Sequence, residues 1–420
     1  MPQVRERSAT AWLVMLLVAV VNYGNFYVYD SIGPVADLLQ RQRGFSDTQI
    51  GLLNAIYSLP NVVLILVGGV LVDRFGAGLM MVVTGGIMLL GAALTAFGPD
   101  FAWMASGRLL FGIGAETNNI ATLAAVASFF AGGNVAFAMG TALAMGRAGS
   151  FSADMSPSWF ADAYAQGWQP PLEIATAIMA VSFAGAFVYL WFEHRQRDPA
   201  VAGAAGPIDR PRLVPRDLLN FGTAYWYLLV LCVLWYAVIL AFRSTFAIKY
   251  FQHAHGLALA PAGAMNSYVF LAAIFATPAF GWLCDRLGRY APMLALGALL
   301  LPIAIAILAL TPWSLWIATV LIGVSYSLVP AVMWPLLSKL VKPSQFGTAL
   351  GLMWVVQNAG IAAANLVAGR LNDAAGASAT NPQGYQPMML FFGVAGSLGC
   401  LFALMLWHRA GRREQEAIVH

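Results

Sequence analysis

Long apolar stretches alternate with short polar breaks along almost the whole chain. Each stretch is long enough for a helix to cross the hydrocarbon core of a bilayer, which takes about 20 residues. Lipid offers no partner to an open backbone N–H or C=O, so every span is expected to be helical. The pattern predicts twelve spans, over residues 11–33, 49–72, 79–97, 102–130, 135–155, 172–193, 223–245, 261–284, 291–311, 313–336, 346–370 and 387–408.

Composition also indicates a membrane protein. Hydrophobic residues make up 60% of the 420 positions, charged residues only 10%, and the mean hydropathy is +0.73. A soluble chain carries about 25% charged residues, so most of this surface is expected to face lipid. The same figures exclude a disordered chain, a collagen, a disulfide scaffold and a nucleic-acid-binding protein. The three cysteines and five histidines have no metal-ligand spacing, so no metal and no cofactor are expected.

The longest polar break, Arg195 to Gly222, separates the sixth and seventh spans and contains five arginines. It predicts an N-terminal six-helix bundle over 1–194, a cytoplasmic linker over 195–222 and a C-terminal six-helix bundle over 223–420. Most lysines and arginines fall on the same side as this linker. Because cytoplasmic loops carry the excess of basic residues, both termini are predicted to be cytoplasmic. Orientation then explains the net charge of +4 without an acidic partner.

One short pattern occurs twice, 212 residues apart. It follows the second and the eighth spans and consists of Gly69, Asp73 and Arg74 in the first copy and of Gly281, Asp285 and Arg286 in the second. The glycine lets helices approach closely, and Asp with Arg at a helix end can lock two bundles together. Repeated halves are what a transporter that rocks about a central site needs. The alternative is a tight turn with a basic flank.

The repeated Gly-x-Leu-x-Asp-Arg-x-Gly pattern, with twelve spans and a basic central loop, resembles the major facilitator superfamily. The resemblance implies an all-α membrane protein of two pseudo-symmetric six-helix bundles that works by alternating access. The first copy has Ala77 and Gly78 where the superfamily has a basic pair. The Gly-Pro-rich antiporter signature is also absent from the fifth span, so drug–proton exchange is not expected.

A narrower resemblance lies in the first 155 residues. Four segments, Tyr27–Asp30, Tyr57–Asn61, Phe111–Glu116 and Arg147–Ser150, are similar to the lysosomal dipeptide transporter branch, the major facilitator superfamily domain-containing protein 1 family. In that family the glutamate after Phe-Gly-Ile-Gly holds the peptide amine, and an arginine in the fifth span holds the carboxylate. The resemblance implies these roles for Glu116 and Arg147, and facilitated diffusion as the mode of transport.

Glu116 and Arg147 also stand out from the residues alone. An unpaired charge at the centre of a spanning helix costs roughly 2.5–3.5 kcal/mol. Counted from the break between the fourth and fifth spans, the two residues lie at depths that differ by about 3 Å. A zwitterion with separated ends would neutralise both, with Arg147 gripping the carboxylate and Glu116 the ammonium. The alternatives are a direct ion pair between them, or one that separates when substrate binds.

The second half has no equivalent charges, since Leu328 and Ala359 stand 212 positions further on. That asymmetry favours a ligand role. Asp30 and Arg108, at the outer ends of the first and fourth spans, are candidates for an outer gate or proton relay, or for a stabilising ion pair. Mid-span aromatic and amide side chains are candidates for lining a cavity, with packing as the alternative: Tyr23, Asn54, Tyr57, Trp235, Tyr236, Tyr268, Tyr326, Trp354, Gln357 and Asn358.

These features predict a secondary transporter for short peptides, dipeptides foremost, acting as a monomer in the cytoplasmic (inner) membrane of a bacterial cell. The alternative cargo is an organic anion or an amino acid, with or without proton coupling. An enzyme is not expected, because the sequence has no nucleophile–base arrangement, metal spacing or phosphate loop. A non-transporting receptor would carry an added soluble domain. Small zwitterions and the lipid bilayer are the expected partners, and no nucleic acid is.

Overall fold

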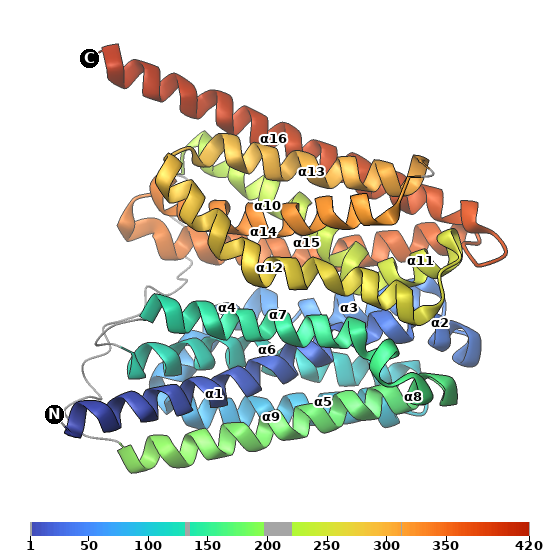
Figure 1. Cartoon of the computed structure of the whole chain (residues 1–420), viewed down its shortest axis with the longest axis horizontal. Helices are drawn as coiled ribbons and strands as arrows, with labels where there is room; N and C mark the ends of the chain where they lie inside the picture. Colours follow the sequence, from blue (N-terminus) through green and yellow to red (C-terminus); the bar gives the residue numbers. More distant parts are fainter. Residues whose placement is uncertain (1, 131–134, 197–220, 312, 420) are drawn as a thin grey trace.

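The computed structural model describes residues 2–130, 135–196, 221–311 and 313–419. Its long helices pack side by side in two bundles, here called the N-half (residues up to 196) and the C-half (residues from 221), as Figure 1 shows. The first helix begins and the last helix ends at the same end of the molecule, the terminal end. The opposite, distal end carries α2, α8 and α11. Most of the predicted linker lies outside the described residues.

The N-half contains nine helices among the described residues, several of them pieces of one bent span. They are α1 (Pro2–Asp30), α2 (Ile32–Arg43), α3 (Asp47–Ser58), α4 (Asn61–Phe75), α5 (Ala77–Phe97), α6 (Phe101–Phe129), α7 (Val135–Trp159), α8 (Ala161–Gln166) and α9 (Gln169–Gln196). Asp100 begins α6 by accepting the Trp103 N–H, and Ser46 caps α3 in the same way through Gln49.

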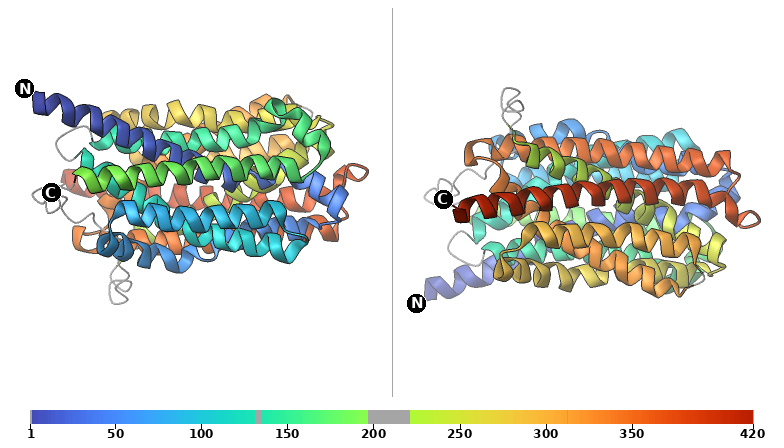
Figure 2. Two further views of the ribbon diagram at one scale, coloured as in Figure 1. Left: turned by 90° about the horizontal axis from the view of Figure 1, so that it is seen from below. Right: turned by 90° about the horizontal axis from the view of Figure 1, so that it is seen from above.

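The C-half also consists mainly of long helices. Figure 2 shows the molecule from below, on the side of the N-half, and from above, on the side of the C-half. The elements of the C-half are α10 (Thr223–Ala241), the π-helix η2 (Phe242–Phe246), α11 (Ala247–His255), α12 (Leu259–Leu287), α13 (Tyr290–Leu310), α14 (Leu315–Leu340), η3 (Pro343–Gln345), α15 (Phe346–Ala374), η4 (Pro382–Tyr385) and α16 (Gln386–Val419).

Among the described residues, ten helices are long and apolar enough to span a membrane, and one bent pair, Asp47–Leu64 with Val67–Phe75, makes eleven. The remaining long helix is α7, which packs against α1 and α12. It carries Arg147 and Asp154 within the bundle. The prediction of an all-helical membrane protein is confirmed, but two predicted spans end too early. The first continues through α2 to Arg43, and the seventh continues through η2 and α11 to His255.

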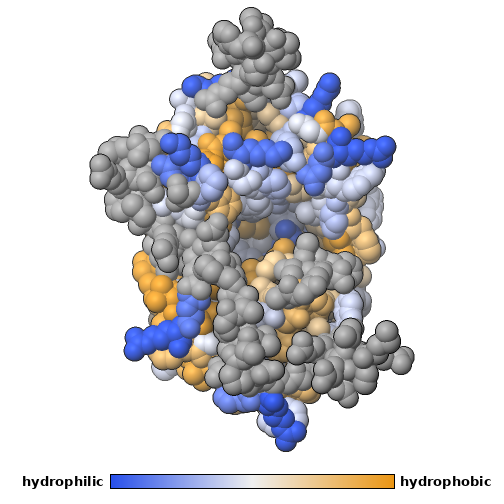
Figure 3. Space-filling model, turned by 90° about the vertical axis from the view of Figure 1, so that its left-hand side faces the viewer, coloured by the Kyte–Doolittle hydropathy of each residue, from blue (hydrophilic) through white to orange (hydrophobic). Residues whose placement is uncertain are grey.

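The two halves meet through α3 with α15, α7 with α12, and α2 with η2 and α11. Glycines allow the close approach: a Cβ at Gly51 would overlap the Asn365 carbonyl oxygen, and a Cβ at Gly263 the Asp154 carbonyl oxygen. At the terminal end the surface is hollowed between the halves, with a hydrophilic group visible in the depth (Figure 3). The chain is therefore closed at the distal end and open at the terminal end.

Candidate functional site

Arg147 lies near the middle of α7, and two glycines beside it seat that helix against α1. A Cβ at Gly149 would overlap the carbonyl oxygen of Tyr23, and one at Gly146 would lie 2.7 Å from the Phe26 ring. Only a residue without a side chain fits such contacts. The small residues around Arg147 therefore fix the position from which its side chain extends.

Glu116 lies near the middle of α6 and is positioned in the same way. A Cβ at Gly112 would overlap the Tyr57 carbonyl oxygen, and one at Gly114 would lie 2.6 Å from the Thr84 carbonyl oxygen. The Asn119 side chain lies beside the Glu116 carboxylate. The Oδ1 of Asn119 in turn accepts a 2.9 Å hydrogen bond from the side chain of Asn25 in α1. The carboxylate is thus held next to amide groups of the N-half.

Neither charge has an ionic partner among the described residues. The salt bridges there do not include Glu116 or Arg147, so the two do not form the direct ion pair that the sequence left open. Both side chains are half-buried. The Arg147 guanidinium instead lies 4.3 Å from the ring centroid of Tyr326 and 5.9 Å from that of Phe270, both in the C-half.

Several aromatic residues singled out in the sequence come together near Arg147. Trp235 stacks on Tyr326 with centroids 6.0 Å apart and donates its Nε1 to Ser325 at 3.0 Å. Tyr236 lies edge-on to Trp235 at 4.8 Å. Trp354 joins them through Trp334, a residue that the sequence pattern does not single out. The C-half therefore presents rings toward Arg147, and its Arg243, which lies over the same Phe270 ring, is close enough to act on Arg147 electrostatically.

The other predicted lining residues divide between the two halves. Tyr23 and Tyr57 are half-buried in the N-half, where Tyr57 packs on Tyr29 with centroids 4.6 Å apart. In α15, Asn358 donates to the Trp354 carbonyl at 3.0 Å. Gln357 accepts a 3.5 Å contact from the thiol of Cys232.

Two predicted lining residues lie elsewhere. Tyr268 is 39% exposed and packs on Trp316 with centroids 5.2 Å apart, whereas Phe270, two positions along α12, contacts Arg147. Residues two apart on a helix point in nearly opposite directions, so Tyr268 faces away from the rings. Asn54 is buried rather than exposed to a cavity, and it donates to Thr245 at 2.7 Å across the closed distal interface.

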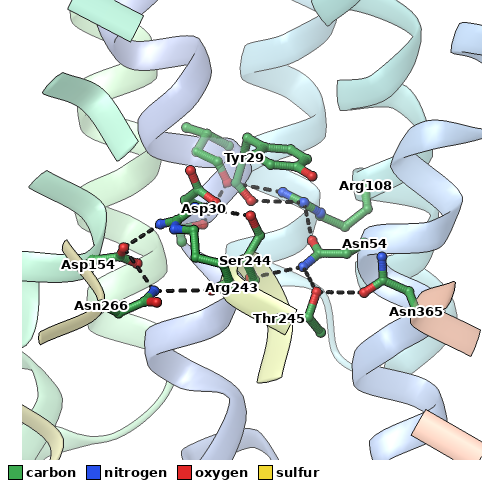
Figure 4. A network of polar contacts seen from close by, with 12 residues as sticks. Tyr29, Asp30, Asn54, Arg108, Asp154, Arg243, Ser244, Thr245, Asn266 and Asn365 are labelled. Carbon is green, nitrogen blue, oxygen red and sulfur yellow. Dashed lines mark hydrogen bonds and ion pairs between the residues drawn. The ribbon is translucent and has the colours of Figure 1, made fainter. Parts of the chain in front are cut away.

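Asp30 and Arg108 do not pair with each other, contrary to one of the alternatives. Arg108 is buried and donates to the carbonyls of Val28, Tyr29 and Leu53 and, at 2.6 Å, to Asn54 (Figure 4). Its guanidinium thus ties α6 to α1 and α3 within one half. Asp30 instead accepts a 2.9 Å ion pair from Arg243 of the C-half.

Arg243 is the centre of a buried ion-pair network at the distal end, here called the distal gate, of which the sequence indicated Asp30 but not Arg243 or Asp154. It pairs with Asp30 of α1 and Asp154 of α7, and Asn266 donates 3.0 Å hydrogen bonds to Asp154 and to the Arg243 carbonyl (Figure 4). All of these side chains are buried. Arg243 lies in the π-turn η2, a feature often found at functional sites.

Further cross-half contacts lie in the same closed region. Lys249 of α11 pairs with Asp47 of α3. The carboxylate of Asp373, from α15, accepts the Asp47 and Thr48 N–H groups at 2.7 and 2.8 Å and so caps the α3 N-terminus.

His253 of α11 also links the two halves in this region. Its Nε2 lies 2.8 Å from Asp37, and its Nδ1 lies 2.8 Å from the Tyr385 hydroxyl. The buried contacts of acidic side chains with basic or histidine side chains that join the two halves in the described residues therefore all link α1, α2, α3 or α7 to η2 or α11.

The repeated motif lies at the open terminal end. Asp73, Arg74, Asp285 and Arg286 are exposed, and Gly69 is buried. Asp285 accepts a 2.5 Å hydrogen bond from Tyr290, and Arg286 lies over Trp282 at 5.3 Å. A Cβ at Gly281 would meet nothing within 4 Å, so the expected close helix approach there is absent in this conformation. A lock between the halves at this end stays a prediction.

Comparison with known proteins identifies the class. The family model of the Major Facilitator Superfamily matches residues 15–365 and 229–418, so the chain belongs to this superfamily and is a membrane transporter. Two crystal structures of the nucleoside transporter NupG share the fold, with TM-scores of 0.74 and 0.71, 13% identity, and coverage of 94% of this chain and 99% of that chain.

Within the superfamily, the chain is similar to the lysosomal dipeptide transporter MFSD1. Identity to the Homo sapiens protein is 29% over 416 residues, covering 96% of this chain and 87% of that protein. Identity to the Bos taurus protein is 29% over 409 residues, covering 94% and 85%. The similarity therefore extends through the second half, beyond the first 155 residues that suggested it. These relatives are transporters rather than enzymes.

Proposed function

We propose that this transporter carries short peptides, dipeptides foremost, by binding their two charged ends between Glu116 and Arg147. The observation that carries the proposal is that a lone carboxylate and a lone guanidinium, both half-buried, project from neighbouring helices of one half without pairing. Buried charges are stable only when something neutralises them. A zwitterion with separated ends neutralises both at once.

The chemistry of each residue suits one end of a dipeptide. The planar guanidinium of Arg147 can donate two parallel hydrogen bonds to a carboxylate. Glu116, beside the Asn119 amide, accepts from an ammonium. The similarity to MFSD1 proteins, whose name describes them as dipeptide transporters, supports the same cargo. An amino acid, whose charges share one α-carbon, is shorter and is the alternative cargo.

The proposal includes a rocking cycle in the cell membrane with both termini cytoplasmic. In the conformation described here the hollow opens at the terminal end (Figure 3), and the ion pairs of the distal gate are formed. The Asp30–Arg243–Asp154 contacts would separate, and the repeated motif at the terminal end would close, when the site turns to the other side. Alternating access of this kind needs no covalent chemistry.

Uptake of radiolabelled Ala-Ala into proteoliposomes tests the proposed function. Wild type is expected to accumulate the peptide to equilibrium with the bath, and Glu116→Gln and Arg147→Ala are each expected to abolish uptake. Unlabelled Ala-Ala should compete, whereas acetate and free alanine should compete much less. Undiminished uptake in either variant would overturn the assigned roles, and competition by acetate alone would point to an organic anion.

Matched controls are available in the chain. Glu173 lies next to a side-chain amide, that of Gln169, as Glu116 does. Arg195 rests 4.0 Å from the Trp191 ring, much as Arg147 rests on Tyr326, but is exposed near the end of α9. Glu173→Gln and Arg195→Ala remove the same charges from outside the site and should keep uptake near the wild-type rate.

A further inference from the structure

The rings near Arg147 continue into a connected aromatic wall on the C-half. Starting from Tyr326, which Arg147 contacts, Trp235 lies 6.0 Å away, Tyr236 lies 4.8 Å from Trp235, Trp334 lies 6.4 Å from Tyr236, and Trp354 lies 6.3 Å from Trp334. These five residues are here called the aromatic wall. Trp334 and Trp354 are only partly buried, so ring surface remains for a ligand to cover.

The surroundings of Glu116 are different in kind. The amides of Asn119 and Asn25 lie on its side of the site, and both belong to the N-half. Tyr57, the aromatic residue nearby, is packed on Tyr29 and Phe111 of its own half. The Arg147 guanidinium thus lies against ring surface of the C-half, with Arg243 and Asp30 close enough to act on it electrostatically, while the Glu116 carboxylate lies beside amides.

A dipeptide held by its two ends has a fixed direction in this site. Its carboxylate is bonded directly to the α-carbon of the C-terminal residue, and the N-terminal α-carbon is about 3.8 Å further along the chain. With the carboxylate on Arg147, the C-terminal side chain therefore leaves the backbone beside the aromatic wall. The N-terminal side chain leaves it nearer the amides.

We infer that the aromatic wall contacts the side chain of the dipeptide's C-terminal residue and selects for it. Trp334 is then a specificity-determining residue for that side chain. This inference rests on the proposed function. An aromatic side chain gains both burial and ring contacts against such a surface. Of two dipeptides with the same composition, the one with its aromatic residue at the C-terminus should bind more tightly.

The isomers Ala-Phe and Phe-Ala provide the test, because they have the same mass, charge and hydrophobicity. Each is used to inhibit uptake of labelled Ala-Ala into proteoliposomes, and the ratio of the two half-inhibitory concentrations is the readout. Wild type should favour Ala-Phe by about tenfold, which corresponds to about 1.4 kcal/mol. Trp334→Leu should bring the ratio close to one, and Trp334→Phe, which keeps a ring, should retain most of the preference.

Trp316→Leu is the matched control, because Trp316 lies on the same helix, is 49% exposed and packs on Tyr268 away from Arg147. It should keep the wild-type ratio. Trp354→Leu replaces Trp334→Leu if the latter protein is not recovered folded. A wild-type ratio near one, or a preference that survives the leucine variant that is measured, overturns the inference, while uptake of Ala-Ala leaves the proposed function standing. Absence of uptake of every dipeptide overturns both.

Discussion

The Arg147 guanidinium lies 4.3 Å from the centroid of the Tyr326 ring, so a cation of the N-half rests against an aromatic ring of the C-half. A ring face attracts a cation but does not neutralise it as a carboxylate would. The arginine is therefore held across the gap between the halves, and within the described part of the chain no hydrogen bond occupies its N–H groups. This arrangement suits a residue that exchanges partners during a transport cycle.

Arg243→Gln should open the distal gate and destabilise the fold. The substitution leaves the buried carboxylates of Asp30 and Asp154 without their cation, and breaking a buried ion pair costs about 3–5 kcal/mol. The melting temperature of the purified protein should fall clearly. Arg41→Gln is the control, since the Arg41 side chain is 63% exposed and its surface pair with Asp37 is worth about 1 kcal/mol or less. Equal melting temperatures for both variants would contradict the account of the gate.

Gly369→Ala should bias the protein away from distal closure. A Cβ there would overlap the Asp47 carbonyl oxygen of the other half, and such overpacking costs about 1–3 kcal/mol. A cysteine at Ile248, which is buried at this interface, should react with a maleimide several-fold faster in the variant, in a background without the three native cysteines.

Gly393→Ala is the control for that substitution, because its nearest neighbouring atom would be 3.8 Å away. It should leave the reactivity of the cysteine at Ile248 unchanged. If both glycine variants behave alike, the contact between α3 and α15 does not limit closure.

Gly149→Ala should weaken dipeptide binding although it changes no charge. The added Cβ would push α7 away from the Tyr23 carbonyl of α1 and displace Arg147, at a cost of about 1–3 kcal/mol. Inhibition curves with Ala-Ala should shift to higher concentration by about tenfold. Gly140→Ala, on the same helix with nothing within 4 Å of the added Cβ, should not shift them. An unchanged curve for Gly149→Ala would mean that Arg147 is positioned by something else.

Orientation is testable with two exposed positions. Leu287 is 52% exposed at the terminal end of α12, and Ala379 is exposed at the distal end. With the termini cytoplasmic, an impermeant maleimide added to intact cells should label Ala379→Cys but not Leu287→Cys, and both after permeabilisation. Labelling in the reverse pattern would invert the proposed topology.

The fold and the presence of two charges within the N-half bundle could be predicted because each depends on a local signal. Span length and hydropathy indicate membrane helices, and Glu116 and Arg147 stand out as ionisable residues in apolar segments. The rotation of each helix about its own axis could not be predicted in the same way, because spans that are apolar on every side do not indicate which face points into the bundle. The sequence pattern therefore predicts Tyr268 rather than Phe270 as a lining residue and does not indicate Trp334.

Asp30 was a candidate gate residue, but the ion pairs of the distal gate could not be predicted because their partners are distant in sequence. Asp30 and Arg243 are separated by 213 positions, and a π-turn alters the direction in which Arg243 projects. Asp154 lies at the end of the predicted fifth span, and Lys249 lies beyond the predicted end of the seventh. In the sequence, Asp154 and Lys249 resemble ordinary charges that flank a span, and only the folded arrangement of the bent helices places them at the interface between the halves.

The most direct test of the bridging of Glu116 and Arg147 is the binding of end-blocked peptides, measured by isothermal titration of the purified protein. Ala-Ala should bind wild type at least about tenfold more tightly than N-acetyl-Ala-Ala or Ala-Ala-amide, since each block removes a charge-assisted contact. In Glu116→Gln, acetylation of the peptide should no longer weaken binding, while amidation still should. In Arg147→Ala, amidation should no longer weaken binding, while acetylation still should. Equal binding of free and blocked peptides to wild type would contradict the account.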